Sequence, residues 1–203
     1  MASESTDSSA PASECPWSAR EAELLAVTLS LLQQHGYERL TVEAVATEAR
    51  ASKATMYRRW PSKADLVLAA FIEGTRESAV HPRTGSLRDD LIAIGTAVCQ
   101  HGRHHAGTMR AVLNEMSRSA ALSAAMQEKF IRHRNVLIEE VLSDAVARGE
   151  IDASVINREI WDVLPGYLVF RSVVSERPPT DDTVRALVDE VLMPSLTRGK
   201  QSG

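Results

Sequence analysis

Two short helical patterns joined by a three-residue turn lie between Thr41 and Lys63, and they constrain the fold more than any other segment. In the first pattern the apolar residues fall at i, i+3, i+4 and i+7 and form one stripe. These residues are Val42, Val45, Ala46 and Ala49. Because such a helix has only about two turns, it must pack on neighbouring helices to be stable.

The second pattern presents an outward face of polar and basic side chains. Ser52 can cap the start of a helix in which Met56 and Trp60 share the inward face. The side chains that point elsewhere are those of Lys53, Thr55, Tyr57, Arg58 and Arg59. An outward set of this kind suits contact with a nucleic-acid duplex.

Local charge supports this interpretation better than total charge does. The chain has a net charge of -4 and a pI near 5.9, which excludes a globally basic nucleic-acid binder. Between Arg50 and Lys63, however, there are five cations and no carboxylate, as phosphate contacts require. The segment is therefore predicted to be a helix-turn-helix that binds DNA.

The segment from Ser52 to Leu66, SKATMYRRWPSKADL, resembles the recognition helix and the following helix start of the tetracycline-repressor (TetR/AcrR) family. The resemblance covers roughly residues 18 to 72, and the remaining chain is similar in length and composition to the family's larger helical C-terminal domain. It implies a transcriptional regulator. The chain departs from the family at Arg50, where the family usually places Gly; a left-handed backbone there costs Arg about 1 kcal/mol.

A recognition helix in the major groove would bring a defined set of side chains to DNA. The candidates for base contacts are Lys53, Thr55, Tyr57 and Arg58, with Ala54 small enough for close approach. The candidates for phosphate contacts are Thr41, Arg59 and Lys63. Two alternatives stay open: Thr41 only caps its helix, and Arg59 is only a solvated surface cation.

Composition indicates an all-α protein. There are only ten Gly, eight Pro and 4% aromatic residues in the 203-residue chain. Two cysteines, Cys15 and Cys99, are too few for a disulfide framework and suit the cytoplasm. No apolar run reaches the ~18 residues that a membrane span needs. The Ser-rich residues 1–15 are predicted to be a disordered tail.

The expected organisation is an N-terminal three-helix DNA-binding domain and a larger C-terminal helical domain for ligand binding and dimerisation. The first helix should begin with the capping box of Ser18 and Glu21 and end at Gly36. A fourth helix should begin at Ser62, which forms an S-x-x-D cap with Asp65. The expected domains are 16–79 and 80–203, with the boundary at the Pro- and Gly-containing segment 80–86. The expected C-terminal helices cover 87–100, 108–118, 121–148, 154–175 and 181–196, with a polar break at 101–107.

The last two of these helices predict a dimer. The helix over 154–175 is apolar on nearly every side, so it needs cover on every side. The pair resembles the four-helix dimer interface of the family, which implies an isologous twofold homodimer. The candidate interface residues are Ile160, Leu164, Tyr167, Leu168, Val184, Leu187, Val188 and Val191. The alternative is that both helices close the core of a monomer.

The resemblance also implies a small-molecule effector bound in the C-terminal domain. The residues that could line its pocket are Met109, Leu113, Met116, Met126, Phe130, Trp161 and Tyr167. A Met and aromatic set at helical spacing is more often part of an ordinary core. The cluster of His101, His104 and His105 lacks an accompanying carboxylate or thiolate and is interpreted as a solvated turn rather than a metal site, and no cofactor is expected.

The leading hypothesis is a ligand-responsive repressor that binds a palindromic operator as a homodimer. The sequence contains no phosphate-binding Gly-rich loop, H-E-x-x-H motif or nucleophile elbow, which argues against an enzyme. The competing hypothesis is a helical ligand- or partner-binding module that has lost specific DNA recognition, with Arg50 as the feature in its favour.

Overall fold

The computed structural model describes residues 17–76, 81–175 and 177–198, and within them every regular element is a helix. The elements are α1 (Ala19–Arg39), α2 (Val42–Glu48), α3 (Lys53–Arg59), α4 (Lys63–Thr75), α5 (Leu87–Met116), α6 (Ala120–Met126), the π-helical η2 (Gln127–Ile131), α7 (Arg132–Ala147), the 3₁₀ turn η3 (Ala153–Val155), α8 (Arg158–Val173), α9 (Asp181–Leu187), the π-helical η4 (Val188–Leu192) and α10 (Met193–Thr197). The predicted disordered tail, 1–15, lies outside the described residues, as does the start of the predicted boundary segment.

Local capping chemistry starts the N-terminal helices as expected. The Glu21 amide donates to Ser18 Oγ at 3.2 Å and the Ser18 amide donates to Glu21 Oε2 at 2.8 Å, which completes the capping box. The Asp65 amide donates to Ser62 Oγ at 3.1 Å at the start of α4. Gly36 is left-handed (φ 75°), as a helix end requires, but α1 resumes after it and continues to Arg39.

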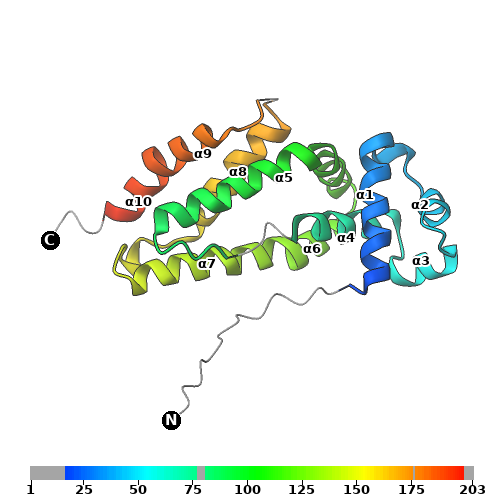
Figure 1. The fold of residues 1–203 in the computed structure, drawn as a ribbon, viewed down its shortest axis with the longest axis horizontal. Coiled ribbons are helices and arrows are strands. Elements are labelled where there is room, and N and C mark those ends of the chain that lie inside the picture. The colour runs from blue at the N-terminus through cyan, green and yellow to red at the C-terminus, as the bar shows by residue number, and fades with distance from the viewer. Residues whose placement is uncertain (1–16, 77–80, 176, 199–203) are drawn as a thin grey trace, which may run out of the picture.

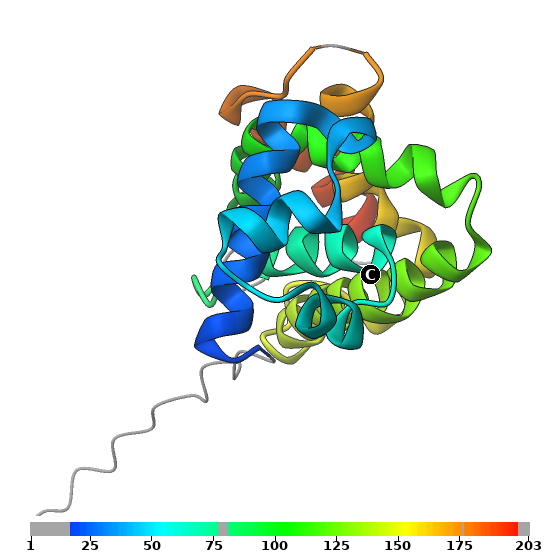
Figure 2. The same ribbon diagram turned by 90° about the vertical axis from the view of Figure 1, so that its right-hand side faces the viewer.

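Figure 1 shows α1, α2 and α3 at one end of an elongated molecule and α8, α9 and α10 toward the other. The view along the long axis shows α2 and α3 presented on the outside of that end (Figure 2). A first hydrophobic core lies among α1 to α4, and a second lies among α5, α7, α8, α9, η4 and α10.

Helix α4 joins these two parts. Six consecutive residues, 66–71, are buried in it, so the helix needs neighbours on nearly every side. Helix α1 covers part of α4, while Val112 of α5 and Leu122 and Met126 of α6 complete the same core. The two predicted domains therefore share a core across the predicted boundary.

The predicted polar break at 101–107 is wrong. This segment lies inside α5, which is continuous from Leu87 to Met116, and only His105 departs from helical backbone angles (φ -121°, ψ 16°). Gly102 packs close to α8: a Cβ there would lie 3.1 Å from Ser172 Oγ. Packing of α5 against α1, α4 and α8 outweighs the weak helix propensity of the glycines.

The turn between α2 and α3 is closed by a Schellman arrangement centred on Arg50. Arg50 has a φ of 49° and is the one non-glycine residue with positive φ among the described residues. The Ala51 amide donates to Ala46 O at 2.8 Å, and the Arg50 amide donates to Thr47 O at 3.1 Å. The Arg20 guanidinium, on α1, also donates to the carbonyls of Ala49 and Arg50. The sequence predicted the position of the turn but not the contribution of Arg20.

Replacing Arg50 with Gly should raise the free energy of unfolding by about 0.5–1 kcal/mol, because Gly adopts a positive φ without a Cβ penalty. The greater backbone entropy of Gly in the unfolded chain offsets only part of this gain. Urea unfolding followed by circular dichroism at fixed protein concentration measures this. Ala44→Gly is the matched control, since Ala44 is exposed within α2, and it should lower the free energy of unfolding by about 1 kcal/mol. Destabilisation by Arg50→Gly would contradict the strain assigned to this turn.

Candidate functional site

Helix α3 is fastened to the core by two side chains and exposes the rest. Met56 is fully buried and Trp60, at the C-cap, is 4% exposed, as their spacing predicted. The residues of this helix that the solvent reaches are Lys53, Ala54, Thr55, Tyr57, Arg58 and Arg59. Ser52 Oγ accepts from the Thr55 amide at 3.1 Å and caps the start of the helix. The exposed face therefore carries three cations, two hydroxyl groups and one small side chain.

A carboxylate on α2 faces this exposed set, and sequence reasoning missed it. Glu43 Oε1 lies 3.3 Å from Lys53 Nζ and accepts a hydrogen bond from Tyr57 Oη at 3.4 Å. Its pKa lies below the ordinary value because its own backbone amide and Lys53 hydrogen-bond to the carboxylate. The sequence gave no sign of this pair, because Glu43, in the first turn of α2, reaches Lys53 and Tyr57 only through the crossing of α2 and α3.

Arg59 is held by the start of α1. Its Nε donates to Glu21 Oε1 at 2.6 Å, and its guanidinium lies 4.8 Å from the centre of the Trp17 ring. The pKa of Glu21 is lowered, first by the Ser18 backbone hydrogen bond and then by contacts that include Arg59. Arg59 is thus more than a solvated cation: it links α3 to α1 in the free protein.

The other two candidates for phosphate contacts also have partners within the chain. Thr41 Oγ1 accepts from the Ala44 amide at 3.0 Å and caps α2. Lys63 Nζ donates to Tyr37 O at 2.8 Å and lies 4.2 Å from the centre of the Tyr37 ring. Burial, with nearby carboxylates, raises the pKa of Tyr37 to about 12. Thr41 lies at the start of α2 and Lys63 at the start of α4.

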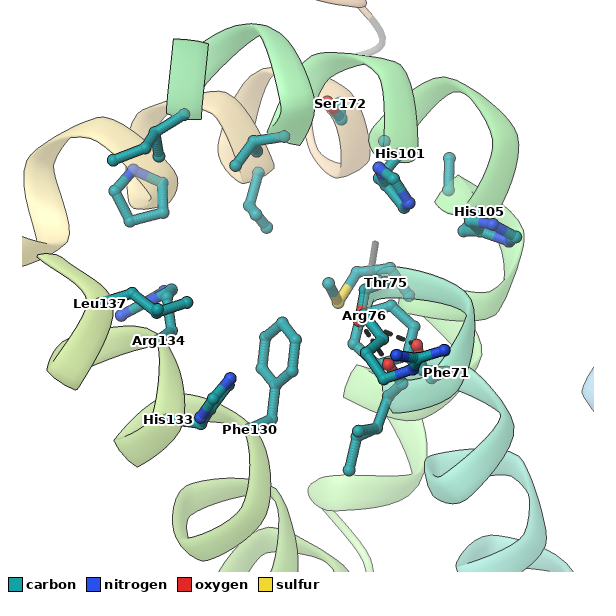
Figure 3. Close-up of a pocket in the computed structure, with 18 of the residues that line it drawn as sticks. Phe71, Thr75, Arg76, His101, His105, Phe130, His133, Arg134, Leu137 and Ser172 are labelled. Carbon is teal, nitrogen blue, oxygen red and sulfur yellow. Dashed lines mark hydrogen bonds between the residues drawn. The ribbon is translucent and has the colours of Figure 1, made fainter. Parts of the chain in front are cut away.

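A cavity of about 450 Å³ lies between α4, α5, α7 and α8. Figure 3 shows Phe130 projecting into it from the α7 side, opposite His101 and His105. Of the seven residues predicted to line a pocket, Met109 and Phe130 line this cavity.

The other five predicted pocket residues do not line it, which corrects that prediction. Leu113 and Tyr167 are exposed, Met126 is buried in the first core, Met116 packs against that core, and Trp161 packs against the second core. Helical spacing placed these residues on apolar faces, but it did not show which faces leave a space between them. The lining residues that the sequence did not single out come from all four helices, α4, α5, α7 and α8.

The predicted interface residues divide into two groups. Leu164, Leu168, Val184, Leu187 and Val188 are buried in the second core of the protomer. At most 8% of each of these residues is exposed in the protomer, so their contribution to a subunit interface would be small, and their assignment to one stays a prediction. Tyr167 and Val191 are exposed and Ile160 is half-buried. The exposed apolar side chains beside them, Phe170 and Val174, were not predicted.

Two further features concern metal and membrane sites. His101, His104 and His105 lie within α5 rather than in a turn, which corrects that expectation. Among the described residues, no three or more His, Cys, Asp or Glu side chains are grouped as a metal ion would require. No helix in the described part of the chain is long and apolar enough to cross a membrane.

Comparison with known proteins agrees with this architecture. Residues 24–70 match the model for bacterial regulatory proteins of the tetR family, and residues 81–191 match the tetracyclin repressor-like C-terminal domain. An HTH-type transcriptional regulator of Mycobacterium tuberculosis H37Rv is 62% identical over 188 residues, 93% of each chain. The DNA-binding transcriptional repressor TetR of Mycobacteroides abscessus is 34% identical over 185 residues, 89% of this chain and 95% of that protein.

Solved structures share the fold along most of the chain. The crystal structure of the TetR family transcription regulator SCO0332 has a TM-score of 0.74 and 29% identity, and the match covers 86% of this chain and 97% of that one. The families and relatives matched are transcriptional regulators, not enzymes. The chain therefore belongs to the TetR family and is a DNA-binding transcriptional regulator with an N-terminal helix-turn-helix and a C-terminal helical domain.

Proposed function

We propose that this regulator is a cytoplasmic, ligand-responsive repressor that binds a palindromic operator as a homodimer. In this proposal residues 16–79 read DNA and residues 80–203 bind the effector and the second subunit. The observation that carries it is the exposed face of α3, where basic and hydroxyl side chains surround a small residue and two buried side chains hold the helix in place. The name of the repressor relative from Mycobacteroides abscessus supports repression.

The proposed DNA contacts divide by residue chemistry. Lys53, Thr55, Tyr57 and Arg58 reach base edges in the major groove, and Ala54 permits close approach. Thr41, Arg59 and Lys63 contact phosphates. Since Lys53, Tyr57, Arg59 and Lys63 have partners within the free chain, DNA binding exchanges those partners for DNA.

The proposed dimer uses the exposed apolar face of α8 and η4. Its side chains are Tyr167, Phe170, Val174 and Val191, which are 39%, 51%, 65% and 46% exposed in the protomer. A cluster of exposed large apolar residues is typical of a protein interface. A twofold dimer would place two copies of α3 on half-sites about 34–36 Å apart, so the operator is expected to be palindromic.

The proposed effector response follows from the position of the cavity. Phe71, Ile72 and Thr75 of α4 line it, and α4 is also the main neighbour of α1. The His101 ring of α5, which packs beside α4, places Nε2 3.0 Å from Gly74 O of α4 and Nδ1 3.1 Å from Ala97 O. A ligand in the cavity therefore contacts the helix that supports the DNA-binding end. Its effect on DNA binding is limited by the difference between its affinities for the DNA-binding and the released conformations.

Selection of bound sequences from a random duplex pool, with purified protein at about 150 mM salt, tests the proposal. Enrichment of a palindrome with half-sites about one helical turn apart is the expected result. Absence of enrichment would instead favour the module that has lost specific DNA recognition.

Arg58→Ala should weaken binding to the selected operator roughly 5- to 150-fold while changing random-sequence binding much less, because an Arg bidentate to guanine discriminates between bases. Arg58 is exposed and has no partner in the described part of the chain, so the variant should fold normally. Arg110→Ala, an exposed cation on α5, is the control. Fluorescence anisotropy with both DNA types measures the difference. An equal loss of affinity for the operator and for random-sequence DNA would mean that Arg58 contacts a phosphate rather than a base.

Glu43→Gln should strengthen binding to random-sequence DNA roughly two- to fivefold at low salt, because it releases Lys53 and removes a carboxylate that faces the duplex. Glu48→Gln, which makes the same charge change at an exposed position of α2, is the matched control and should have a smaller effect. The salt dependence of affinity separates the two variants. An equal effect of both would mean that only total charge matters.

Phe170→Asp should convert the dimer to a monomer, because a carboxylate in an apolar interface is buried without a partner. Val136→Asp is the control, since Val136 is an exposed apolar residue of α7. Sedimentation at several protein concentrations measures the mass of both variants. An unchanged dimer in Phe170→Asp, with normal circular dichroism, would exclude this face of α8 as the interface.

A further inference from the structure

The walls of the cavity are mainly apolar and enclose a space of the size that small molecules occupy. The apolar side chains come from all four helices around it. They include Phe71, Ile94, Val98, Met109, Phe130 and Val169. A ligand that fills this space must therefore have a large apolar body.

Among the described residues that line the cavity, the ionisable groups are all basic or imidazole groups and none is a carboxylate. Two of them are occupied in holding α4: His101 contacts Gly74 O, and Arg76 Nε donates to Glu73 at 3.1 Å. His105 Nδ1 lies 3.3 Å from the Gln33 amide. Figure 3 shows His133 and Arg134 on α7, at the opposite wall. A cationic ligand would find no partner of opposite charge here, whereas an anionic one would.

Arg134 has a hydrogen-bonding edge that faces no partner. Its Nη2 donates to Asp162 Oδ1 at 2.7 Å and contacts Asn135 Oδ1 at 3.3 Å, but its Nε is buried and has no hydrogen-bond acceptor. A buried N–H of a charged group without an acceptor is costly. Burial also lowers the pKa of Arg134, while Asp162 opposes this change. An acceptor supplied by a ligand would remove this cost.

We propose that the cavity binds a molecule with a long apolar body and one carboxylate, which accepts from Arg134 Nε and lies beside His133. This inference rests on the proposed function, since it names the chemical class of the proposed effector. The apolar chain extends along Phe130 toward Phe71 and Met109, so that one end of the ligand touches α7 and the other touches α4. A carboxylate is chosen because its oxygens pair with an Arg edge through charge-assisted hydrogen bonds.

Calorimetric titration of the purified full chain with three probes of equal length tests the class: dodecanoate, dodecan-1-ol and dodecylammonium, each below the concentration at which it forms micelles. Dodecanoate should bind about ten- to a hundredfold more tightly than dodecanol, as one charge-assisted hydrogen bond predicts. Dodecylammonium should bind most weakly. Equal affinities, preference for the alcohol or the amine, or no binding of dodecanoate would each overturn the proposal.

Two substitutions with opposite expected effects test the role of Arg134. Arg134→Gln should reduce dodecanoate affinity to that of dodecanol and leave dodecanol affinity nearly unchanged. Asp162→Asn removes the competing carboxylate and should strengthen dodecanoate binding several-fold; Asp162 is 71% exposed, so the change should be tolerated. Arg132→Gln is the matched control, because Arg132 is exposed on the same helix, pairs with Glu128 and does not line the cavity. Weakening by Asp162→Asn would mean that the Arg134–Asp162 pair only maintains the structure.

Release of the selected operator separates this inference from the proposed function. Carboxylate-selective binding without operator release would support the ligand class and contradict the effector role. Failure of dodecanoate to bind, while other compounds release the operator, would overturn the ligand class and leave the repressor proposal standing.

Discussion

The burial of α4 is the constraint on which the rest of the structure depends. Its residues 66–71 are all buried, so α1 must cover one side while α5 and α6 cover another. Gly74 permits the close approach of α1, since a Cβ there would lie 2.6 Å from Leu29 Cδ1. Helix α4 also forms part of the cavity wall, so one helix contacts both the DNA-binding end and the cavity.

Carboxylates of α1 and α2 orient three of the exposed side chains of α3 in the protein without DNA. Glu43 orients Lys53 and Tyr57, and Glu21 orients Arg59. These exposed pairs contribute little to stability, since solvent screens them. In the proposed complex a phosphate or a base would replace each carboxylate, which would favour DNA sites that offer a full set of acceptors.

Much of the N-terminal half could be predicted because its signals are local. The Ser18 capping box, the Ser62 cap and the inward face of Met56 and Trp60 each depend on residues within one or two helical turns. The contacts of Arg20 with the turn and of Glu43 with α3 could not be predicted, since both join residues brought together by helix crossing. The prediction of a break at 101–107 was wrong for the same reason, because packing against neighbouring helices keeps α5 helical across its glycines.

By itself, the sequence determined the helical class, the place of the turn at Arg50 and the exposed basic face of α3, because helical periodicity, capping and local charge act over a few residues. Only the tertiary structure decided which apolar residues of α8 and α9 close the protomer core and which stay exposed. It also decided where the cavity lies and that Arg134 reaches it. The physical reason is that periodicity assigns a residue to a face of its helix, whereas packing between helices decides what that face meets.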